Sequence, residues 1–415
     1  MPKRIVLSCW GSYGDLFPYL GMARRLQALG HAPVIATCSI HADLVRGEGL
    51  EFAPLRPDID PTNRALIARV MDPKRGSEVV LRELVVPGVA DAYADLMVAA
   101  RGADLIVTHP IIFAGPMVAE TLGLPWVSTV LSPLSFFSLH DFPVMAPMPQ
   151  MVHLRKLGPW TSRALMRIAR RMTRSWMAPV VAFRARLGLA PGGDPLYEGQ
   201  FSPHGTLALF SRVIGPPQPD WPVNAHATGF VFDNRAIAMP PGVSEFLDRG
   251  EPPVVFTLGS SAIGSPGAFY EESVQAVRAL GQRAILLIGN EDNRPRDPLP
   301  PGVLAVLGAP HDQVFPRAAA IVHQGGIGTT AQALRSGRPT LVVPHAHDQP
   351  DNAFRVSNLG VARVVYPPRY RAARVATELR RLLNDSSYAQ AAAKVADVVK
   401  AEDGAGAAAR FLVGT

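Results

Sequence analysis

The chain has 415 residues, of which 48% are hydrophobic and 18% charged, so it can build more than one sizeable core. It carries 41 Lys and Arg against 34 Asp and Glu. Its two cysteines, Cys9 and Cys38, are too few for a disulfide framework or a four-thiolate metal site. The apolar run 5–10 is too short for a signal-peptide core, and no run approaches the roughly 18 residues that span a bilayer. These features predict a cytoplasmic globular protein.

The first half alternates short apolar runs with helical patterns. The spacing predicts strands over 4–8, 33–37, 104–108, 126–130 and 206–210. It predicts helices over 16–29, 89–101 and 115–122. Such alternation is typical of βαβ units and of a parallel sheet covered on both faces. The segment 131–149 has no clear period but is apolar and aromatic, so we expect it to form part of the wall of a pocket for an apolar ligand.

A basic helix is predicted over 161–178. No acidic residue occurs between Asp141 and Asp194, whereas nine Lys and Arg do. Leu165, Ala169, Met172 and Trp176 recur at helical spacing on one face, with Arg163, Arg167, Arg170 and Arg174 on another. We interpret this as an apolar face under a solvated one, with contact to an anionic membrane or an acidic partner as the alternative. No nucleic-acid-binding motif accompanies the charge, so we expect no nucleic-acid partner.

The segment 215–222 holds four prolines and predicts a stiff connector between two domains, 1–214 and 223–387. Beyond it, strands are predicted over 254–258, 284–288, 303–307, 319–323 and 340–343. Helices are expected over 268–280 and from residues 328, 352 and 374 onward. The fold class is therefore α/β, with two doubly wound, Rossmann-like domains. Ligands of such sheets bind beyond the carboxyl ends of the strands, which places the site in a cleft between the domains.

The segment from His323 to Thr330 is the most informative in the chain. An apolar strand runs into Gly325, Gly326 and Gly328, then two threonines, and then a helix. Glycines let backbone N–H groups approach an anion, and a helix N-terminus adds about half a positive charge. We interpret the segment as a phosphate-binding loop, with a tight structural turn as the alternative. It is neither a Walker loop nor the dinucleotide fingerprint.

A polar loop over 344–352 follows the next strand. Its two His and two Asp residues could suggest a metal, but their spacing does not match a zinc site. Asp348 and Gln349 place a carboxylate beside an amide, a pair that suits hydrogen bonding to several sugar hydroxyls.

These residues resemble a known family. The run 323–330, followed by Gly337-Arg338-Pro339 and 344–349, resembles the donor signature of family 1 glycosyltransferases, which have the GT-B fold. The opening 11–18 resembles the branch of sterol glucosyltransferases, glycopeptide-antibiotic glycosyltransferases and the rhamnolipid rhamnosyltransferase. The resemblance covers essentially the whole chain. It implies that the C-terminal segment 388–415 returns to the first domain.

The resemblance also implies roles in binding a nucleotide sugar. The donor diphosphate would contact His323, which would replace a cation together with the helix dipole, so that no metal or cofactor is needed. The other diphosphate contacts implied by the resemblance are Gly325, Gly326, Gly328, Thr329, Thr330, Gly259 and Ser260. The resemblance further implies that Asp348 and Gln349 bind the sugar. At the nucleoside, Ala309-Pro310 replaces the usual Trp, and Gln332 replaces the usual Glu, which leaves uridine and thymidine open.

The general base is less clearly marked. Tyr13 occupies the position of the histidine that many members carry, and a phenol with a pKa near ~10 is a poor base at pH 7. Asp15 matches an aspartate with that role in the glycopeptide enzymes; an N-cap for the following helix is its alternative. His109 and His140 are reserve candidates. For the acceptor, the candidates are Tyr13, Phe136, Phe137, Phe142 and Met145, with core packing as the alternative for the apolar loop residues.

Together these features predict an inverting, metal-independent hexosyltransferase. It would use a UDP- or dTDP-sugar and a hydroxyl on a hydrophobic small molecule, such as a phenolic, polyketide, sterol or lipid. The alternatives are a non-catalytic accessory protein that activates a partner transferase and a nucleotide-sugar 2-epimerase.

Overall fold

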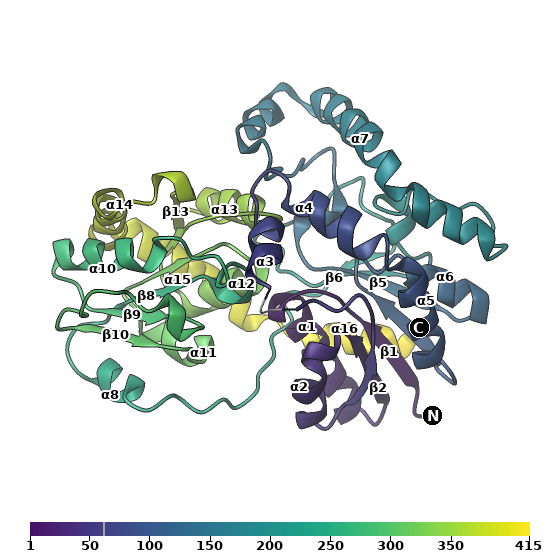
Figure 1. The fold of residues 1–415 in the computed structure, drawn as a ribbon, viewed down its shortest axis with the longest axis horizontal. Coiled ribbons are helices and arrows are strands. Elements are labelled where there is room, and N and C mark those ends of the chain that lie inside the picture. The colour runs from purple at the N-terminus through teal and green to yellow at the C-terminus, as the bar shows by residue number, and fades with distance from the viewer. Residues whose placement is uncertain (61–62) are drawn as a thin grey trace.

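Two parallel β-sheets, one in each half of the chain, carry the fold (Figure 1). The computed structural model describes residues 1–60 and 63–415. Every strand pairing within either sheet is parallel, and helices cover the sheets. The predicted α/β class with two Rossmann-like sheets is confirmed.

The first sheet has the strand order β3-β2-β1-β4-β5-β6-β7. Its strands are β1 (Arg4–Ser8), β2 (Ala32–Thr37), β3 (Glu51–Pro54), β4 (Leu105–Thr108), β5 (Trp126–Val130), β6 (Thr206–Ala208) and β7 (Ala225–Ala227). The central strand β1 is buried on both faces, so Ile5, Val6 and Leu7 form an unbroken apolar run. The helices of this half are α1 (Tyr13–Ala28), α2 (Ala42–Gly47), α3 (Arg64–Val70), α4 (Gly76–Val79), α5 (Val89–Ala99), α6 (Ala114–Leu122) and α7 (Pro159–Arg186).

The first sheet extends past the Pro-rich segment 215–222. We expected the strand near 206–210 to be its last, but β7 follows that segment and pairs with β6. The edge strands β3 and β7 were missed because they are short and only partly buried, which leaves no apolar run to detect. Trp221 of the Pro-rich segment stacks on Phe136 at a centroid distance of 4.0 Å, so this connector packs against the first half.

The second sheet has the order β10-β9-β8-β11-β12-β13. Its strands are β8 (Val254–Thr257), β9 (Ala284–Leu287), β10 (Val303–Val306), β11 (Ala320–His323), β12 (Thr340–Val342) and β13 (Ala362–Val364). Its helices are α8 (Val243–Asp248), α9 (Gly259–Ala262), α10 (Phe269–Leu280), α11 (His311–Val314), α12 (Ile327–Ser336), α13 (Gln349–Asn358) and α14 (Ala372–Asn384). The strand order reverses at β8 and β11, so the ends of these two strands form the switch point where such sheets bind ligands.

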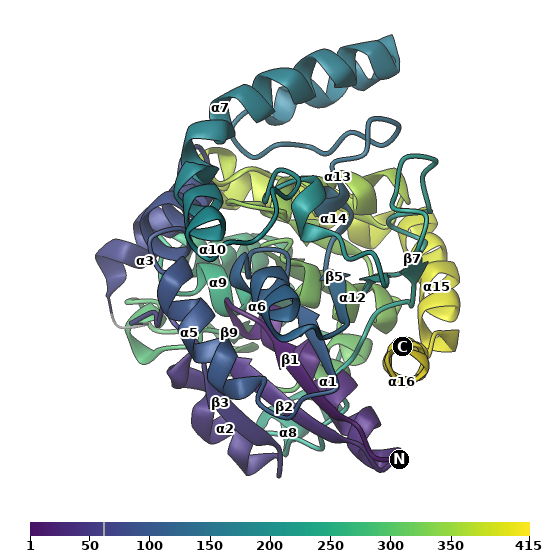
Figure 2. The same ribbon diagram turned by 90° about the vertical axis from the view of Figure 1, so that its right-hand side faces the viewer.

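Two final helices carry the chain back to the first half. Helix α15 (Ser386–Ala401) packs on α12, and α16 (Gly404–Gly414) packs on α1, beside the N-terminal strands (Figure 2). Ala408, Ala409 and Leu412 of α16 are buried in the core that surrounds α1. Gly404 lies against the carbonyl of Phe230, where a Cβ would collide with backbone. The C-terminal segment therefore joins the second sheet to the first half.

Helix α7 runs along the edge of the molecule (Figure 2), and its register corrects the predicted faces. Met172, which we placed on the buried face, is 60% exposed. Trp160 and Ile168 on the same helix are also exposed. The residues that pack inward are Met166, Met177, Val180 and Phe183. The apolar residues of α7 therefore form two faces, and the spacing pattern had mixed members of both.

Candidate active site

The N-termini of two helices face one another where the halves meet. Helix α1 follows β1 of the first sheet, and α12 follows β11 of the second. A Cβ placed on Gly328 would lie 3.5 Å from the Cα of Gly14, so the backbones approach closely. The predicted phosphate-binding loop and the predicted catalytic loop therefore share one site.

The phosphate-binding loop leaves its polar atoms unused. Gly325 has φ +88°, a conformation suited to glycine, and a Cβ there would lie 2.8 Å from Val342. Gly326 is the N-cap of α12, so no side chain accepts from the N–H groups of the first turn. Three buried side-chain atoms of this loop have no hydrogen-bond partner in the described part of the chain: Nε2 of His323, Oε1 of Gln324 and Oγ1 of Thr330. Buried polar atoms without partners are costly, so this loop is built to receive a polar ligand.

His323 is a neutral hydrogen-bond donor. Its Nδ1 accepts from the backbone N–H of Gly325 at 3.1 Å, so the ring proton is on Nε2. Burial lowers its pKa to about 3, with the neighbouring His311 ring adding to the effect. We expected His323 to act in place of a cation together with the helix dipole. A neutral ring can contribute to this by donating a hydrogen bond from Nε2, while the helix N-terminus supplies partial positive charge.

The loop after β8 approaches the same site. Gly259 has φ +59°, and a Cβ there would collide with the side-chain amide of Gln324. Ser260 is exposed beside it, and the Oγ of Ser261 accepts from the Gln349 amide at 3.4 Å. The structure thus brings 259–261 next to both the phosphate-binding loop and the predicted sugar-binding pair.

Asp348 and Gln349 are held by different partners. The Oδ2 of Asp348 accepts from the Asn352 amide at 2.7 Å, and burial raises its pKa to about 7. Asn352 also donates to the carbonyl of Gly325 at 2.9 Å, which ties α13 to the phosphate-binding loop. The Gln349 oxygen accepts from the N–H groups of His345 and Ala346, so it shapes the loop. Sequence analysis missed Asn352, although it lies one helical turn after Asp348 and hence on the same face.

Two further polar residues of this loop have protein partners. His347 contacts Ser77 at 3.2 Å between Nδ1 and Oγ, and burial lowers the pKa of its ring. Asp351 is buried and accepts from Arg355 and from the N–H of Val144. Of the side chains that had suggested a metal, His345 differs, because its Nε2 is buried without a partner in the described chain.

Asp15 and His109 lie together at the start of α1. Ser12 is the N-cap, and Asp15 is the third helical residue, whose Oδ2 accepts from the Ser12 N–H at 2.8 Å. Asp15 therefore completes a capping box and is not itself the N-cap that we considered. Its Oδ1 lies 3.5 Å from His109 Nε2. His109 Nδ1 accepts from the Ile111 N–H at 3.4 Å, which leaves the ring proton on Nε2, facing the carboxylate.

His140, the other reserve base, lies elsewhere. It is exposed, and its backbone N–H donates to the Oγ of Ser138. No recorded contact joins the described His140 side chain to Asp15 or His109. The structure brings two of the three predicted bases together.

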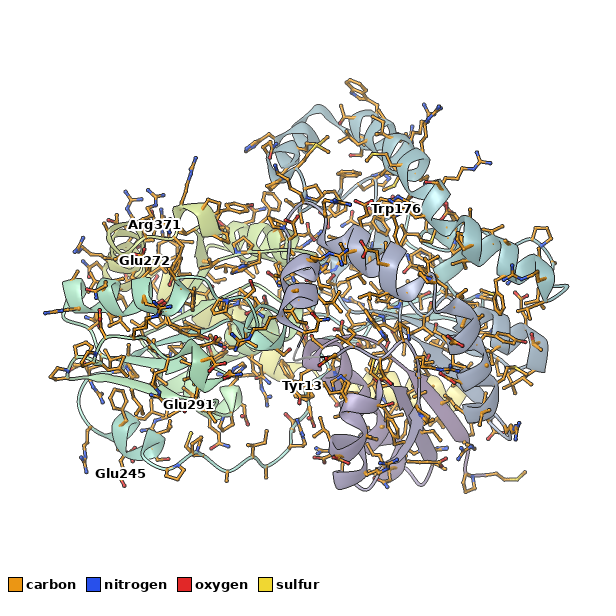
Figure 3. The ribbon with its side chains drawn as sticks, in the orientation of Figure 1. Tyr13, Trp176, Glu245, Glu272, Glu291 and Arg371 are labelled. Carbon is orange, nitrogen blue, oxygen red and sulfur yellow. The ribbon has the colours of Figure 1, made fainter. Side chains whose placement is uncertain are left out.

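The predicted acceptor residues divide into exposed and packed groups. Tyr13 is 45% exposed at the junction of the halves (Figure 3) and stacks on Phe17 at 5.3 Å. Phe136 is buried in an aromatic stack with Trp221. Phe137 and Phe142 pack around Tyr197, and Met145 is half-buried. Tyr13 thus has free surface, whereas Phe136 and Phe142 serve the core.

The predicted nucleoside residues lie on α11 and α12. Pro310 is the N-cap of α11, and Ala309 before it is half-buried. The Oε1 atom of Gln332 on α12 is buried without a partner in the described chain. It therefore retains the capacity to accept a hydrogen bond.

Comparison with known proteins identifies the family. Residues 271–408 match the erythromycin biosynthesis protein CIII-like C-terminal domain. O-mycaminosyltylonolide 6-deoxyallosyltransferase of Streptomyces fradiae is 33% identical over 97% of this chain and 94% of its own length. The chain belongs to the family 1 glycosyltransferases. This glycosyltransferase is also 30% identical to glycosyltransferase GtfE of Amycolatopsis orientalis, over 99% of the chain and 97% of the relative. Sterol 3-beta-glucosyltransferase UGT80B1 of Arabidopsis thaliana is 28% identical over 98% of this chain and 67% of its own length.

Solved structures agree on the fold. The spinosyn forosaminyltransferase SpnP superposes with a TM-score of 0.72 at 19% identity, over 100% of this chain and 99% of that one. SsfS6 of Streptomyces sp. SF2575, complexed with thymidine diphosphate, gives 0.65 at 21% identity, over 100% of both chains. The architecture is GT-B. Among the helices that the structure describes, none is long and apolar enough to cross a membrane.

The raised pKa of Asp348 predicts a pH-dependent stability. Between about pH 4 and pH 7 the folded carboxyl binds a proton that the unfolded one does not, so its contribution to the free energy of unfolding falls as pH rises. Asp348→Asn removes this contribution. We expect the free energy of unfolding of the variant, relative to that of the wild type, to rise by about 1.4 kcal/mol per pH unit across this window. Chemical denaturation at several pH values measures the difference.

The buried histidines do not affect the comparison between Asp348→Asn and the wild type. The pKa values of His323 and His345, lowered to about 3 and about 4, oppose the Asp348 effect, but both proteins carry them, so they cancel in the difference. If the free energies of unfolding of the two proteins change in parallel with pH, the raised pKa of Asp348 is contradicted.

Proposed function

We propose that this glycosyltransferase moves a hexose from a UDP- or dTDP-sugar to a hydroxyl of a hydrophobic small molecule, with inversion and without a metal ion. The observation that carries the proposal is the set of buried, unpartnered polar atoms at the N-terminus of α12. Two relatives, an O-mycaminosyltylonolide 6-deoxyallosyltransferase and a sterol 3-beta-glucosyltransferase, support the substrate class. The thymidine diphosphate complex of SsfS6 supports the donor class.

The proposed donor contacts follow from the loop geometry. A diphosphate at the N-terminus of α12 would accept from the free N–H groups of the first turn, from His323 Nε2 and from the Thr330 hydroxyl. These donors are fixed before the reaction and buried, so they would stabilise the negative charge that grows on the departing nucleoside diphosphate. Gly259 and Ser260 would cover the other side. This arrangement supplies the reason for metal independence.

The sugar would lie between the phosphate-binding loop and α13. Asp348 and Asn352 share one face of α13, and Asn352 contacts the loop. The Oδ1 atom of Asn352 is buried without a partner in the described chain, so it can accept from a sugar hydroxyl. The nucleoside would lie near Ala309, Pro310 and Gln332.

Asp15 is the proposed general base. Its carboxylate is about one-third exposed, whereas His109 behind it is buried. The Ser12 N–H and the Nε2–H of His109 orient Asp15, which leaves its exposed side free to take the acceptor proton. In the proposed complex, Asp15 on α1 and the leaving group at α12 would lie on opposite sides of the sugar, as inversion requires. Tyr13 would support the acceptor.

His323→Ala tests the donor site. Loss of a hydrogen bond to a charged group is expected to cost about 1.5–3 kcal/mol, or roughly 10- to 100-fold in UDP or dTDP affinity. Isothermal titration calorimetry measures the change. The control is His226→Ala on β7, where the ring only stacks on Phe411. Equal affinities for the two variants would refute the role of His323.

Asp15→Asn tests the base. We expect transfer to fall by about 10²- to 10⁴-fold while nucleotide affinity is kept, because only proton transfer is lost. Product formation from dTDP-glucose with a phenol panel measures turnover. Ser12→Ala is the matched control, since it removes the capping hydroxyl but keeps the carboxylate. If Ser12→Ala loses as much activity, Asp15 acts through the fold of α1.

We also propose that α7 touches anionic membranes peripherally. Trp160, Ile168 and Met172 are exposed apolar residues of α7, and an arginine lies within three positions of each in the sequence. Lipid headgroups and acyl chains together match this pattern. The flanking arginines are Arg163, Arg167 and Arg171.

Vesicle sedimentation tests the membrane contact. We expect binding to phosphatidylglycerol vesicles, weak binding to phosphatidylcholine, and a loss of at least 10-fold when the three flanking arginines become Gln. The control replaces three arginines at the N-cap and along α14, namely Arg371, Arg374 and Arg381. Equal losses in both triple variants would show that only net charge matters and would remove α7 from the proposal.

A further inference from the structure

Arg355 is a buried arginine that touches both halves of the molecule. Its helix, α13, lies on the side of the second half that faces the first (Figure 1), and the Arg355 side chain is 6% exposed. Its Nε donates to Asp351 on the same helix at 2.7 Å. Its Nη1 donates to Asp141 at 2.6 Å and to the carbonyl of Ile214 at 2.9 Å, both in the first half.

A second connection crosses beside it. The Oδ1 of Asp351 accepts from the backbone N–H of Val144 at 2.8 Å. Asp141 and Val144 both belong to the segment 131–149, which we propose as part of the acceptor pocket. We call Arg355, Asp351 and Asp141 the clamp. It ties one helix of the donor half to the backbone and side chains of the acceptor segment.

The same helix starts at the donor site. Asp348 and Gln349 lie at the N-terminus of α13, and Asn352 is in its first turn. At 1.5 Å per residue, Arg355 lies only about 10 Å along the axis from Asp348. A helix of this length moves as a rigid body, so a sugar that fixes its N-terminus also fixes the position of the clamp.

The outer side of the clamp is not packed solid. A cavity of about 450 Å³ adjoins it, lined by Arg355, Asp141 and Ile214 together with residues of both halves. The Nη2 of Arg355 is buried without a partner in the described chain. Because there is room beside the guanidinium, the clamp can open without breaking a close-packed core.

We propose that Arg355 is a positioning residue that couples donor binding to the order of the acceptor segment. The inference rests on the proposed function and deepens it. The clamp stabilises the arrangement in which α13 presents Asp348 and Asn352 to the sugar, and the donor stabilises that same arrangement. Each therefore favours the other, as linkage requires. Without Arg355, two carboxylates face each other across the junction and the halves lose their shared cation.

Hydrogen exchange with and without dTDP-glucose tests the coupling. In the wild type we expect the sugar nucleotide to slow exchange in 323–330 and to slow it at least five-fold in 139–148. In Arg355→Met the slowing in 323–330 should remain, while that in 139–148 should fall below two-fold. Arg355→Lys, which keeps the charge, should restore part of it. Asp141→Asn breaks the same connection from the first half and serves if Arg355→Met does not fold.

Arg363→Met is the matched control. Arg363 pairs with Glu378 inside the second half, so its loss removes an ion pair that does not cross the junction. The control should keep the slowing in both segments even if its melting temperature falls. Slowing in 139–148 that persists in both clamp variants, or that is absent from the wild type, would overturn the inference. No slowing in 323–330 of the wild type would overturn the proposed donor site and the inference with it.

Discussion

The structure depends on the unmet hydrogen-bonding capacity at the N-terminus of α12. A buried donor or acceptor without a partner costs about 1–3 kcal/mol, and three such atoms surround one turn of backbone. Folding alone gains nothing from leaving these atoms unpaired. An anion that accepts from His323 Nε2 and from the Thr330 hydroxyl would remove part of the cost, whereas the Gln324 oxygen is an acceptor and needs a donor.

The proposed mechanism also requires that this anion lie opposite a base. Gly14 and Gly328 approach closely, since a Cβ on Gly328 would be in van der Waals contact with the Cα of Gly14. This approach sets the capping box of Ser12 and Asp15 against the phosphate-binding loop. The return of α16 to α1 helps to hold the two halves in this arrangement. The clamp at Arg355 adds a buried polar connection on the acceptor side. The site is thus a property of the junction and of neither half alone.

Much of the fold could be predicted from the sequence, because central parallel strands are continuous apolar runs. β1 and β5 begin and end at the predicted residues. The edge strands β3 and β7 escaped detection, since one face of an edge strand is solvated and a run of three residues has no period. The faces of α7 were assigned wrongly because its apolar residues lie on two sides.

Features of the candidate site that depend on local sequence could be predicted. Features that depend on tertiary contacts could not. Glycines before a helix led us to predict a phosphate-binding loop, and the comparisons confirm the family that this segment indicated. The relatives are named transferases, which gives no support to the epimerase or accessory alternatives. The neutral state of His323 depends on burial, and the pairing of Asp15 with His109 joins residues 94 positions apart, so neither follows from spacing.

A crystal structure with bound UDP or dTDP tests the central claim most directly. The account predicts the β-phosphate within hydrogen-bond distance of His323 Nε2 and of the first-turn N–H groups of α12, with the phosphates facing Asp15. A nucleotide bound elsewhere, with these atoms still unpartnered, would contradict it.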